Sequence, residues 1–285
     1  MQKIWVCGAR GQIGQAVNDV VDKLEFEMLD TDVDDLDVTD TDEVLRFGEM
    51  NRPDIIINCS GMTDISSCEE NPSQAFKVNA LGARNLAIVA AKMQAKMVQL
   101  STDDVFDGKS TEPYTEFDIT NPGTVYGKSK LAGENYVKEF TTKHFIVRST
   151  WVYGKGQNFI NGFLKKVDAG EQLSIASDQF GSPTSANELA RFLLHLVHTS
   201  EYGTYHATNK GVCSRYAFAQ EILKMTGKTA SMQPVPTVMS DFSKVRPAYA
   251  GLDNFIMSMV PIYDFPDWQD SLREYLEERG LYHAE

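Results

Sequence analysis

The chain has 285 residues, of which 42% are hydrophobic and 24% charged, and its formal net charge is −13. This length fits one large α/β domain, or one such domain with a smaller lobe. The acidic balance repels phosphate backbones and anionic lipid surfaces, so we expect neither a nucleic-acid partner nor a membrane partner.

The N-terminus and the cysteines are typical of a reducing compartment. The chain passes from Met1 straight into a short apolar run without a signal-peptide pattern, and no apolar run is long enough to cross a bilayer. The four cysteines form neither a CxxC pair nor a zinc spacing. They are Cys7, Cys59, Cys68 and Cys213. We therefore expect a cytoplasmic protein, and we predict no metal site.

A glycine-rich turn follows the first predicted strand, Lys3–Cys7. Gly8, Gly11 and Gly14 are followed by apolar residues at helical spacing up to Val21. In this context Gly8 permits a tight turn, Gly11 lets the backbone approach a pyrophosphate, and Gly14 allows close packing of helix on strand. The GxxGxxG spacing is the form seen in short-chain dehydrogenases, so we predict a dinucleotide site here.

The second predicted strand, Phe26–Leu29, ends in Asp30 and opens an acidic run. An acid at this place in such a unit hydrogen-bonds the adenosine ribose. Asp30, Asp32 and Asp34 would repel a 2′-phosphate, and Arg10 is the one residue that could reach across to it. We therefore predict NADH or NADPH as cofactor, with NADH preferred.

Alternating strands and helices continue to about residue 150. The run Asp54–Asn58 is apolar throughout, as expected of a strand covered on both faces. A helix over Ala75–Ala95, a strand over Lys96–Leu100 and a strand over His144–Val147 follow. This alternation predicts an α/β fold with a doubly wound parallel sheet of the Rossmann type, and we assign residues 1–150 to an NAD(P)-binding domain.

Beyond residue 150 the pattern loosens. Residues 151–285 are predicted to form a smaller substrate-binding lobe, whose segments can interleave with the first domain, at the carboxyl ends of the strands. Helices are expected over Phe159–Val167, Asn187–His198, Ser214–Met225 and Trp268–Arg279.

Tyr126 and Lys130 are four residues apart and share one face of a predicted helix. An ammonium beside a phenol lowers the tyrosine pKa from about 10 towards neutral, which suits a general acid. Taken alone, the pair is also the pattern of a half-solvated helix face. Thr102, at the end of the fourth strand, would polarise a carbonyl while Tyr126 protonates the alkoxide and the cofactor supplies a hydride.

These motifs, with several others, give the chain its resemblance to a known family. The further motifs are Leu36–Asp40, Asn79–Asn85, Ser101–Asp103 with Val105–Gly108, Val125–Gly127 with Ser129–Glu134, Arg148–Gly154, Asp178–Thr184, Arg246–Pro247 and Trp268–Leu272. Over essentially its whole length the chain resembles the dTDP-4-dehydrorhamnose reductases, extended short-chain enzymes that make dTDP-L-rhamnose for polysaccharides.

The resemblance implies a role for each matching residue. Thr102, Tyr126 and Lys130 would be catalytic, with Tyr126 and Lys130 also contacting the cofactor. Trp151 would lie against the sugar, or else be a core residue, and Arg246 would lie near the nucleotide diphosphate, or else form a surface salt bridge. The residues expected to line the dinucleotide are Gly8, Gly11, Gln12, Ile13, Gly14, Asp30, Asp37, Val38 and Thr63.

Three departures from the family pattern fall where we expect the sugar pocket. Asp104 replaces a tyrosine, only hydroxyls remain at Ser66 and Ser67, and Tyr249–Gly251 replace an Asn-Ser pair. Asp104 would either accept hydrogen bonds from sugar hydroxyls or turn to solvent and cap a loop amide. The reaction type is therefore better defined than the sugar.

Two other functions are compatible with the same features. One is a reductase or epimerase of another NDP-4-ketosugar. The other is a non-catalytic NAD(P)-binding regulatory subunit, against which the intact Thr102, Tyr126 and Lys130 argue. We expect a nucleotide-sugar substrate in each catalytic case. The oligomeric state is left open, a homodimer included.

Overall fold

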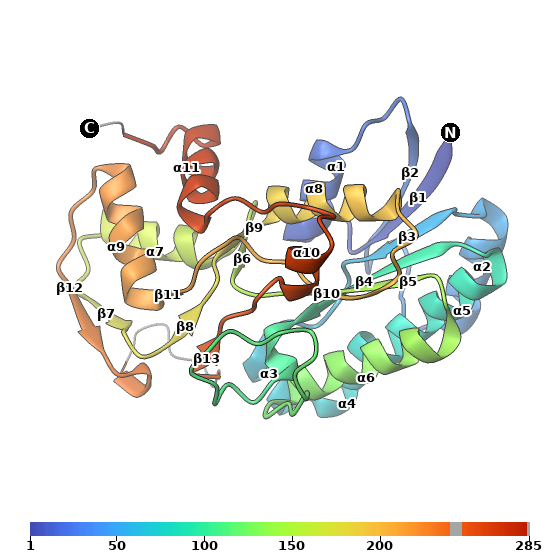
Figure 1. Cartoon of the computed structure of the whole chain (residues 1–285), viewed down its shortest axis with the longest axis horizontal. Coiled ribbons are helices and arrows are strands. Elements are labelled where there is room, and N and C mark those ends of the chain that lie inside the picture. The colour runs from blue at the N-terminus through green and yellow to red at the C-terminus, as the bar shows by residue number, and fades with distance from the viewer. Residues whose placement is uncertain (240–246, 284–285) are drawn as a thin grey trace.

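Figure 1 presents the computed structural model of the chain, which describes residues 1–239 and 247–283. Its centre is a six-stranded parallel sheet with the order β10-β5-β4-β3-β1-β2. The strands are β1 (Gln2–Cys7), β2 (Phe26–Thr31), β3 (Ile55–Asn58), β4 (Lys96–Thr102), β5 (His144–Ser149) and β10 (Gly203–His206). The predicted doubly wound parallel sheet is confirmed.

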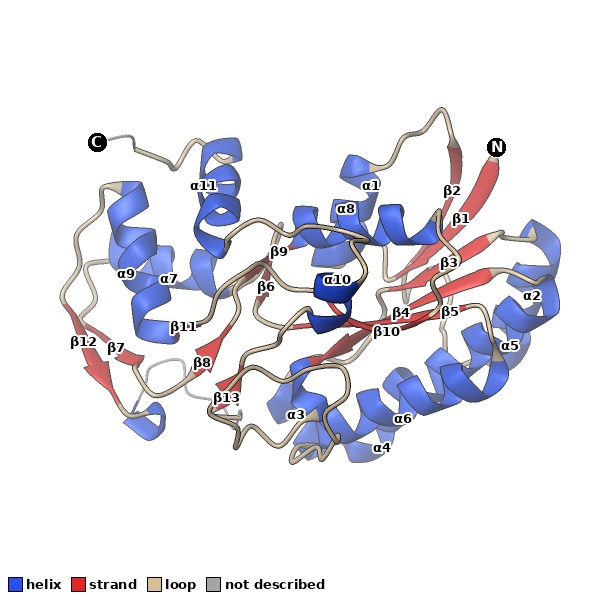
Figure 2. Cartoon of the chain, viewed as in Figure 1, coloured by secondary structure: helices blue, strands red, loops and turns tan. Residues whose placement is uncertain are grey.

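Helices cover both faces of this sheet because successive side chains of each strand point to opposite sides. Ile4 and Val6 of β1 pack in the cluster that contains α1 and α8, whereas Trp5 and Cys7 pack in the cluster that contains α2, α5 and α6. Figure 2 shows the two helix layers. The helices are α1 (Gln12–Val20), α2 (Thr41–Asn51), α5 (Ala83–Met93), α6 (Val125–Phe140) and α8 (Ala186–Val197).

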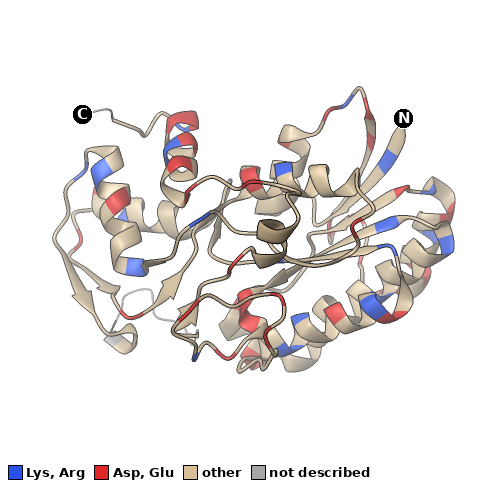
Figure 3. Cartoon of the chain, viewed as in Figure 1, with Lys and Arg blue, Asp and Glu red and all other residues tan. Residues whose placement is uncertain are grey.

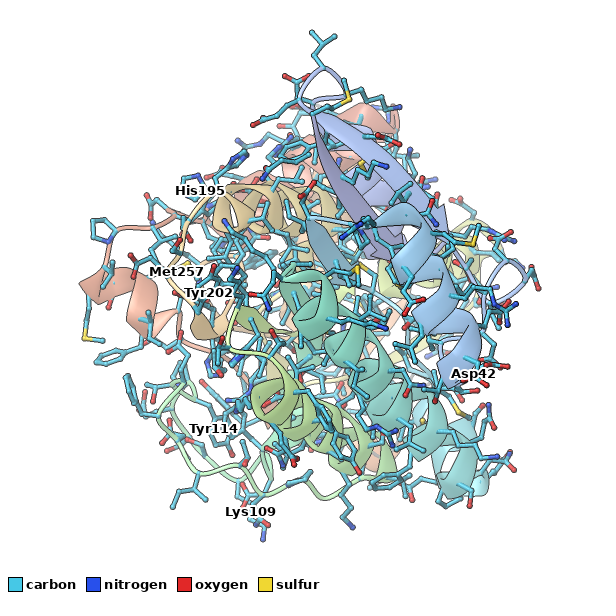
Figure 4. The ribbon with its side chains drawn as sticks, turned by 90° about the vertical axis from the view of Figure 1, so that its right-hand side faces the viewer. Asp42, Lys109, Tyr114, His195, Tyr202 and Met257 are labelled. Carbon is cyan, nitrogen blue, oxygen red and sulfur yellow. The ribbon has the colours of Figure 1, made fainter. Side chains whose placement is uncertain are left out.

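Figure 4 shows the molecule turned by 90° from the view of Figure 1, so that the helices on the two faces of the sheet are seen side by side. His195 of α8 and Met257 of α10 (Phe255–Met259) lie on one side of the sheet, and Asp42, in the first turn of α2, lies on the other. The side chain of Asp40 caps α2 by accepting a bond from the amide of Glu43, as expected of an aspartate at a helix start.

The helix predicted over Ala75–Ala95 is divided in the structure. A short helix α4 (Pro72–Phe76) passes into a π-helical turn, Lys77–Gly82, before α5 begins. Asn79 in this turn accepts from the Met62 amide at 2.8 Å and donates to the Ser129 hydroxyl at 2.9 Å. The π-turn therefore ties the loop after β3 to helix α6, and this bond could not be inferred from periodicity.

The second lobe has its own apolar core, formed mainly by helices α7 (Phe159–Asp168), α9 (Arg215–Thr226) and α11 (Trp268–Glu278) with strand β7 (Leu173–Ala176). β7 pairs in parallel with β12 (Met232–Val235). In Figure 1 this lobe lies beside the carboxyl ends of the main sheet. The four helices predicted beyond residue 150 are confirmed, with bounds that differ by at most one residue.

The remaining elements are short. They are α3 (Ile65–Glu70), the 3₁₀ turns η2 (Asp103–Val105) and η3 (Thr237–Met239), and strands β6 (Val152–Tyr153), β8 (Phe180–Gly181), β9 (Thr184–Ser185), β11 (Cys213–Ser214) and β13 (Tyr249–Ala250). Because β10 and α8 come from beyond residue 150 and yet belong to the main sheet and its covering layer, the two lobes interleave in sequence. The division at residue 150 stays a prediction.

Charged residues are arranged to suit this architecture. Figure 3 shows them mainly along the outer helices and loops, with both signs interspersed, while the central strands are largely neutral. Within the described residues, no helix is long and apolar enough to cross a membrane.

Candidate active site

The glycine turn has the shape that a bound pyrophosphate requires. Gly8 has a φ of +77°, and a Cβ there would lie 2.7 Å from the amide nitrogen of Ser60. A Cβ on Gly14 would lie 2.3 Å from the carbonyl oxygen of Gly8. Gly11 is the N-cap of α1 and has no side chain to satisfy the first amides of the helix. Those amides can therefore bind an anion.

Two cavities meet at this turn. One has a volume of about 700 Å³ and the other about 400 Å³. Both are lined by Gly11 and by Cys59, Ser60 and Gly61, which follow β3. Together they form one cleft across the carboxyl ends of the parallel strands, where ligands bind in open α/β sheets. A dinucleotide spanning the cleft would have its diphosphate at the start of α1.

The smaller cavity has the residue types of an adenosine site. Asp37 and Val38, which we expect at the dinucleotide, line it together with Asp32. Asp30 does not line it and its side chain is exposed, although we expected it to meet the ribose. Strand β2 runs two residues further than predicted, to Thr31, so the carboxyl end of the strand presents Asp32 instead.

Arg10 is engaged by the acidic residues of the adjacent loop. Its guanidinium bonds to Asp34 at 2.9 Å and to Asp35, and its backbone amide donates to Asp32. These bonds raise the Arg10 pKa and lower the pKa of the Asp35 carboxyl. Arg10, which we predict could reach a 2′-phosphate, is thus already paired with carboxylates.

The larger cavity contains the three predicted catalytic side chains. Thr102, Tyr126 and Lys130 line it, and they are only 5%, 8% and 5% exposed. Gln12, Ile13 and Thr63, expected at the cofactor, line the same cavity. Thr102 ends β4, and Tyr126 and Lys130 lie in the first two turns of α6. The sequence motifs therefore converge on one site.

Helix α6 begins where it does because Thr124 caps it. The Thr124 hydroxyl accepts a bond from the amide of Gly127 at 3.0 Å. Gly127 also allows the helix to approach the backbone of Asp104, since a Cβ there would lie 2.0 Å from the Asp104 carbonyl oxygen. This contact brings the first turn of α6, with Tyr126, against the end of β4.

Burial lowers the pKa of Lys130 to about 8, with Glu134 and Cys59 acting in the opposite direction. Glu134 lies one turn further along the same face of α6 and is fully buried. It accepts bonds from Arg148 of β5 at 2.9 and 2.7 Å and from Ser101 of β4 at 2.6 Å. These bonds hold α6, β4 and β5 in one arrangement.

The opposite wall of the cavity is supplied by the second lobe. Trp151, Phe159 and Arg215 line this wall. Trp151 has the unusual backbone angle φ of +47°. The guanidinium carbon of Arg215 lies 3.4 Å from the centroid of the Trp151 ring. Gly181 leaves room for the indole, because a Cβ there would lie 2.4 Å from its Cε2 atom. Trp151 therefore faces the larger cavity, and its contact with the sugar stays a prediction. Arg215 was not predicted.

Two buried hydroxyls were also missed. Ser149 and Thr150 follow directly along β5 and line the larger cavity. Within the described part of the chain, neither hydroxyl has a hydrogen-bond partner. The side-chain oxygen Oε1 of Gln12 also has no partner there. Buried polar atoms are normally paired, so these are positioned for a ligand. Their place at the carboxyl end of a predicted strand was the signal that could have identified them.

The three departures from the family pattern do not surround the cavity. Asp104 is 1% exposed and lines neither cavity, because η2 carries it beneath the first turn of α6. The Asp104 carboxylate therefore faces neither the cavity nor the solvent, and Asp103 lines the cavity instead. Ser67 donates to Asp64, and Tyr249 stacks on Phe180. Arg246 lies outside the described residues, and its predicted role stays a prediction.

The doubly wound sheet, the glycine turn and the Tyr126–Lys130 pair define an extended short-chain dehydrogenase/reductase fold. Comparison with known proteins identifies the family within this class of enzymes. The family model described as the RmlD substrate binding domain matches residues 1–280, and the chain belongs to this family.

Individual relatives match along their whole length. A spore coat polysaccharide biosynthesis protein of Bacillus subtilis is 35% identical over 281 residues, which are 98% of this chain and 99% of that protein. A dTDP-4-dehydrorhamnose reductase of Clostridium acetobutylicum has a similar structure, with 40% identity, a TM-score of 0.95 and coverage of 98% and 100%. The enzyme of that name from Bacillus anthracis, solved with NADP, has 35% identity, a TM-score of 0.94 and the same coverage.

Proposed function

We propose that this chain is an NAD(P)H-dependent dTDP-4-dehydrorhamnose reductase, which reduces the 4-keto group of dTDP-4-dehydro-L-rhamnose to give dTDP-L-rhamnose for polysaccharide synthesis. The observation that carries the proposal is the presence of Thr102, Tyr126 and Lys130 in one cavity that continues into the glycine turn. Family membership and the two reductases of similar structure support the choice of substrate.

The residues present fit a nicotinamide dinucleotide. The first amides of α1 would bind its diphosphate, the smaller cavity with Asp32, Asp37 and Val38 would hold the adenosine, and the larger cavity would receive the nicotinamide. When bound in its reduced form, this cofactor supplies the hydride. The enzyme of similar structure solved with NADP supports the assignment.

Each catalytic side chain has a role that follows from its place. In the structure the Thr102 hydroxyl donates a hydrogen bond to Asp103 at 3.1 Å. When the substrate binds, this hydroxyl would donate instead to the carbonyl oxygen of the sugar and polarise it, and Tyr126 would donate its phenolic proton to the same oxygen as the alkoxide forms. Lys130, as an ammonium on the same helix face, favours the phenolate that remains and binds the ribose next to the nicotinamide. All three side chains are largely buried, so the bound substrate and cofactor would displace the water that can reach them.

The proposal is tested by supplying dTDP-4-dehydrorhamnose, a panel of other 4-ketosugar nucleotides and reduced cofactor, and following loss of NADH or NADPH absorbance. We expect the highest kcat/KM for dTDP-4-dehydrorhamnose. Faster turnover of another ketosugar nucleotide would assign the enzyme to a different branch of the same chemistry. If the chain reduced no ketosugar nucleotide but still bound the cofactor, the result would favour a non-catalytic regulatory subunit.

We also propose the cytoplasm as the place of action. All four cysteines are free, with three of them buried, which fits a reducing compartment. Fractionation of the native cells, with the protein followed by a specific antibody, would test this location.

A further inference from the structure

The short helix α3 is bonded to the start of α6, the helix that carries the catalytic tyrosine. The carboxylate of Glu69, near the carboxyl end of α3, accepts a hydrogen bond from the backbone amide of Val125 at 2.8 Å. Val125 is the first residue of α6, and Tyr126 is the second. Figure 1 shows α3 beside this end of α6. The bond therefore joins segments 56 positions apart in the chain, at the residue that precedes Tyr126.

The amide of Val125 needs an acceptor from outside its own helix, because the first amides of a helix have no carbonyl one turn earlier to bond to. Thr124 provides the acceptor for the amide of Gly127 at 3.0 Å, and Glu69 provides it for the amide of Val125. A carboxylate suits this place, since a helix N-terminus carries partial positive charge. The amides on either side of Tyr126 are thus both held by side chains.

The tyrosine itself is also held by residues of α3. Ile65 and Cys68 are buried in one small apolar cluster with Tyr126 and Ala75. Glu69, in contrast, is exposed. Replacing Glu69 therefore keeps the apolar cluster around the ring and removes only the bond to the backbone of α6. This separation makes the contribution of the bond measurable in a folded protein.

Helix α3 also follows directly on residues that line the cleft. Thr63 lines the larger cavity and Met62 the smaller one, and α3 begins two residues after Thr63. The segment expected to contact the cofactor is therefore continuous with the helix that holds Tyr126. Proton transfer is sensitive to errors in position, since a displacement of about 1 Å can cost roughly 10²-fold in rate.

We propose that Glu69 is a positioning residue for the reduction: its bond to the Val125 amide fixes the first turn of α6, and so the place of the Tyr126 hydroxyl relative to the keto group of the sugar. This inference rests on the proposed function. Glu69 is absent from the described lining of both cavities, so it acts through α6 and not by touching a ligand.

The test compares three variants of the full chain with the wild type. Glu69→Ala removes the acceptor, whereas Glu69→Gln keeps an oxygen that can accept the same bond. Glu70→Ala is the matched control, because Glu70 is the next residue of α3, has the same charge and is exposed. Thermal unfolding checks that each variant is folded. Steady-state kinetics with dTDP-4-dehydrorhamnose and NADH are then measured in H2O and in D2O.

For Glu69→Ala we expect kcat to fall by about tenfold, as a proton donor out of place requires. KM for the nucleotide sugar and the dissociation constant of NADH should stay within about threefold of the wild type, since no ligand contact is lost. Glu69→Gln should recover most of the loss, and Glu70→Ala should behave as the wild type. The ratio of kcat in H2O to kcat in D2O should rise in Glu69→Ala, because proton transfer becomes the slower step.

Amide hydrogen exchange, followed by mass spectrometry, gives a second measurement that needs no substrate. Peptides that contain Val125, Tyr126 and Gly127 should exchange about tenfold faster in Glu69→Ala than in the wild type, because the first turn of α6 opens more often without its acceptor. The same peptides should exchange at the wild-type rate, within about threefold, in Glu69→Gln and Glu70→Ala.

Three results would overturn the inference. One is an unchanged kcat in folded Glu69→Ala. Another is an equal loss in Glu69→Gln and Glu69→Ala, which would assign the effect to the charge and not to the bond. The third is a lower kcat with the wild-type isotope ratio, which means that only the fraction of folded enzyme has changed. Failure of the proposed function is a separate observation: the wild type would then reduce no ketosugar, and the exchange rates would still confirm or refute the bond.

Discussion

The two walls of the larger cavity are built in different ways. The wall formed by the main sheet and α6 is tied together by buried hydrogen bonds, in which Glu134 joins Ser101 and Arg148 across three elements. The wall formed by the second lobe depends on stacked rings and one guanidinium, with Trp151, Phe159 and Arg215 in contact.

The difference between the two walls matches the different demands of proton transfer and of substrate recognition. Proton transfer requires donors held to within a fraction of an ångström, and a buried, fully bonded carboxylate provides that. Recognition of a substrate needs a complementary surface, for which aromatic stacking is sufficient. We therefore expect changes in the sheet wall to reduce kcat or stability and changes in the lobe wall to raise KM.

The largest effect is expected at Tyr126. Tyr126→Phe removes the proton donor and keeps the ring, so kcat should fall by roughly 10²- to 10⁴-fold, the usual contribution of a general acid. The dissociation constant of NADH, measured by fluorescence titration, should stay within about threefold of the wild type. A variant with unchanged kcat would remove Tyr126 from the mechanism.

Glu134 tests the rigidity of the sheet wall. Glu134→Ala leaves Arg148 buried without its carboxylate partner, and breaking such a buried pair costs about 3–5 kcal/mol of unfolding free energy. Urea denaturation followed by circular dichroism measures this loss. Lys138→Ala is the control, since Lys138 is 40% exposed and only 3.7 Å from Glu134, and it should cost less than about 1 kcal/mol. Equal losses in both variants would contradict the comparison.

The pH dependence tests the state of Lys130. Burial lowers its pKa to about 8, and the ammonium is the active form, so activity is present below pH 8 and is lost as the pH rises through that value. kcat/KM should fall by about tenfold per pH unit well above the pKa. In Lys130→Arg the cation does not titrate, so a lower activity without this decline is expected. A decline at the same pH in both proteins would assign it to another group.

Gly181 tests the lobe wall without removing a side chain. Gly181→Ala would place a Cβ 2.4 Å from Cε2 of Trp151 and displace the indole. KM for the nucleotide sugar should rise by about tenfold, with kcat within about threefold of the wild type. Gly123→Ala serves as the control, because no atom lies within 4 Å of the added methyl group. A fall in kcat with unchanged KM would mean that Trp151 positions the reacting carbon itself.

The smallest effect is expected at Arg10. Its guanidinium is paired with Asp34 and Asp35, so we expect NADH to be preferred, and Arg10→Ala should change the NADH-to-NADPH ratio of kcat/KM by less than about threefold. Steady-state kinetics with both cofactors measures the ratio. A clear NADPH preference that disappears in Arg10→Ala would show that the guanidinium leaves these carboxylates for the 2′-phosphate.

The motifs that could be predicted from sequence are those in which neighbouring residues act together. Gly8, Gly11 and Gly14 follow a strand and open a helix, and Tyr126 and Lys130 occupy one helix face. Local spacing fixes such geometry. The order of strands and helices followed from the same periodicity, and with it the parallel sheet.

The features that could not be predicted depend on exact element ends or on distant contacts. Asp30 was selected over Asp32 because β2 was expected to end two residues earlier. Asp104 was expected either at the sugar or in solvent, because nothing in the sequence indicates the 3₁₀ turn that buries it. Arg215 reaches the cavity only because α9 packs near Trp151, 64 positions earlier in the chain, and no pattern within one segment records that contact.

The most direct test of the account follows the hydride. Wild-type protein is mixed with dTDP-4-dehydrorhamnose and NADH deuterated at either C4 position of the nicotinamide, and the product is examined by NMR. We predict that one of the two labelled cofactors transfers deuterium to C4 of the sugar and yields dTDP-L-rhamnose, and that Tyr126→Phe slows the appearance of this signal at least a hundredfold. Recovery of unreduced ketosugar with both labels, or deuterium at any other carbon, would contradict the assignment of this cavity as a 4-ketosugar reductase site.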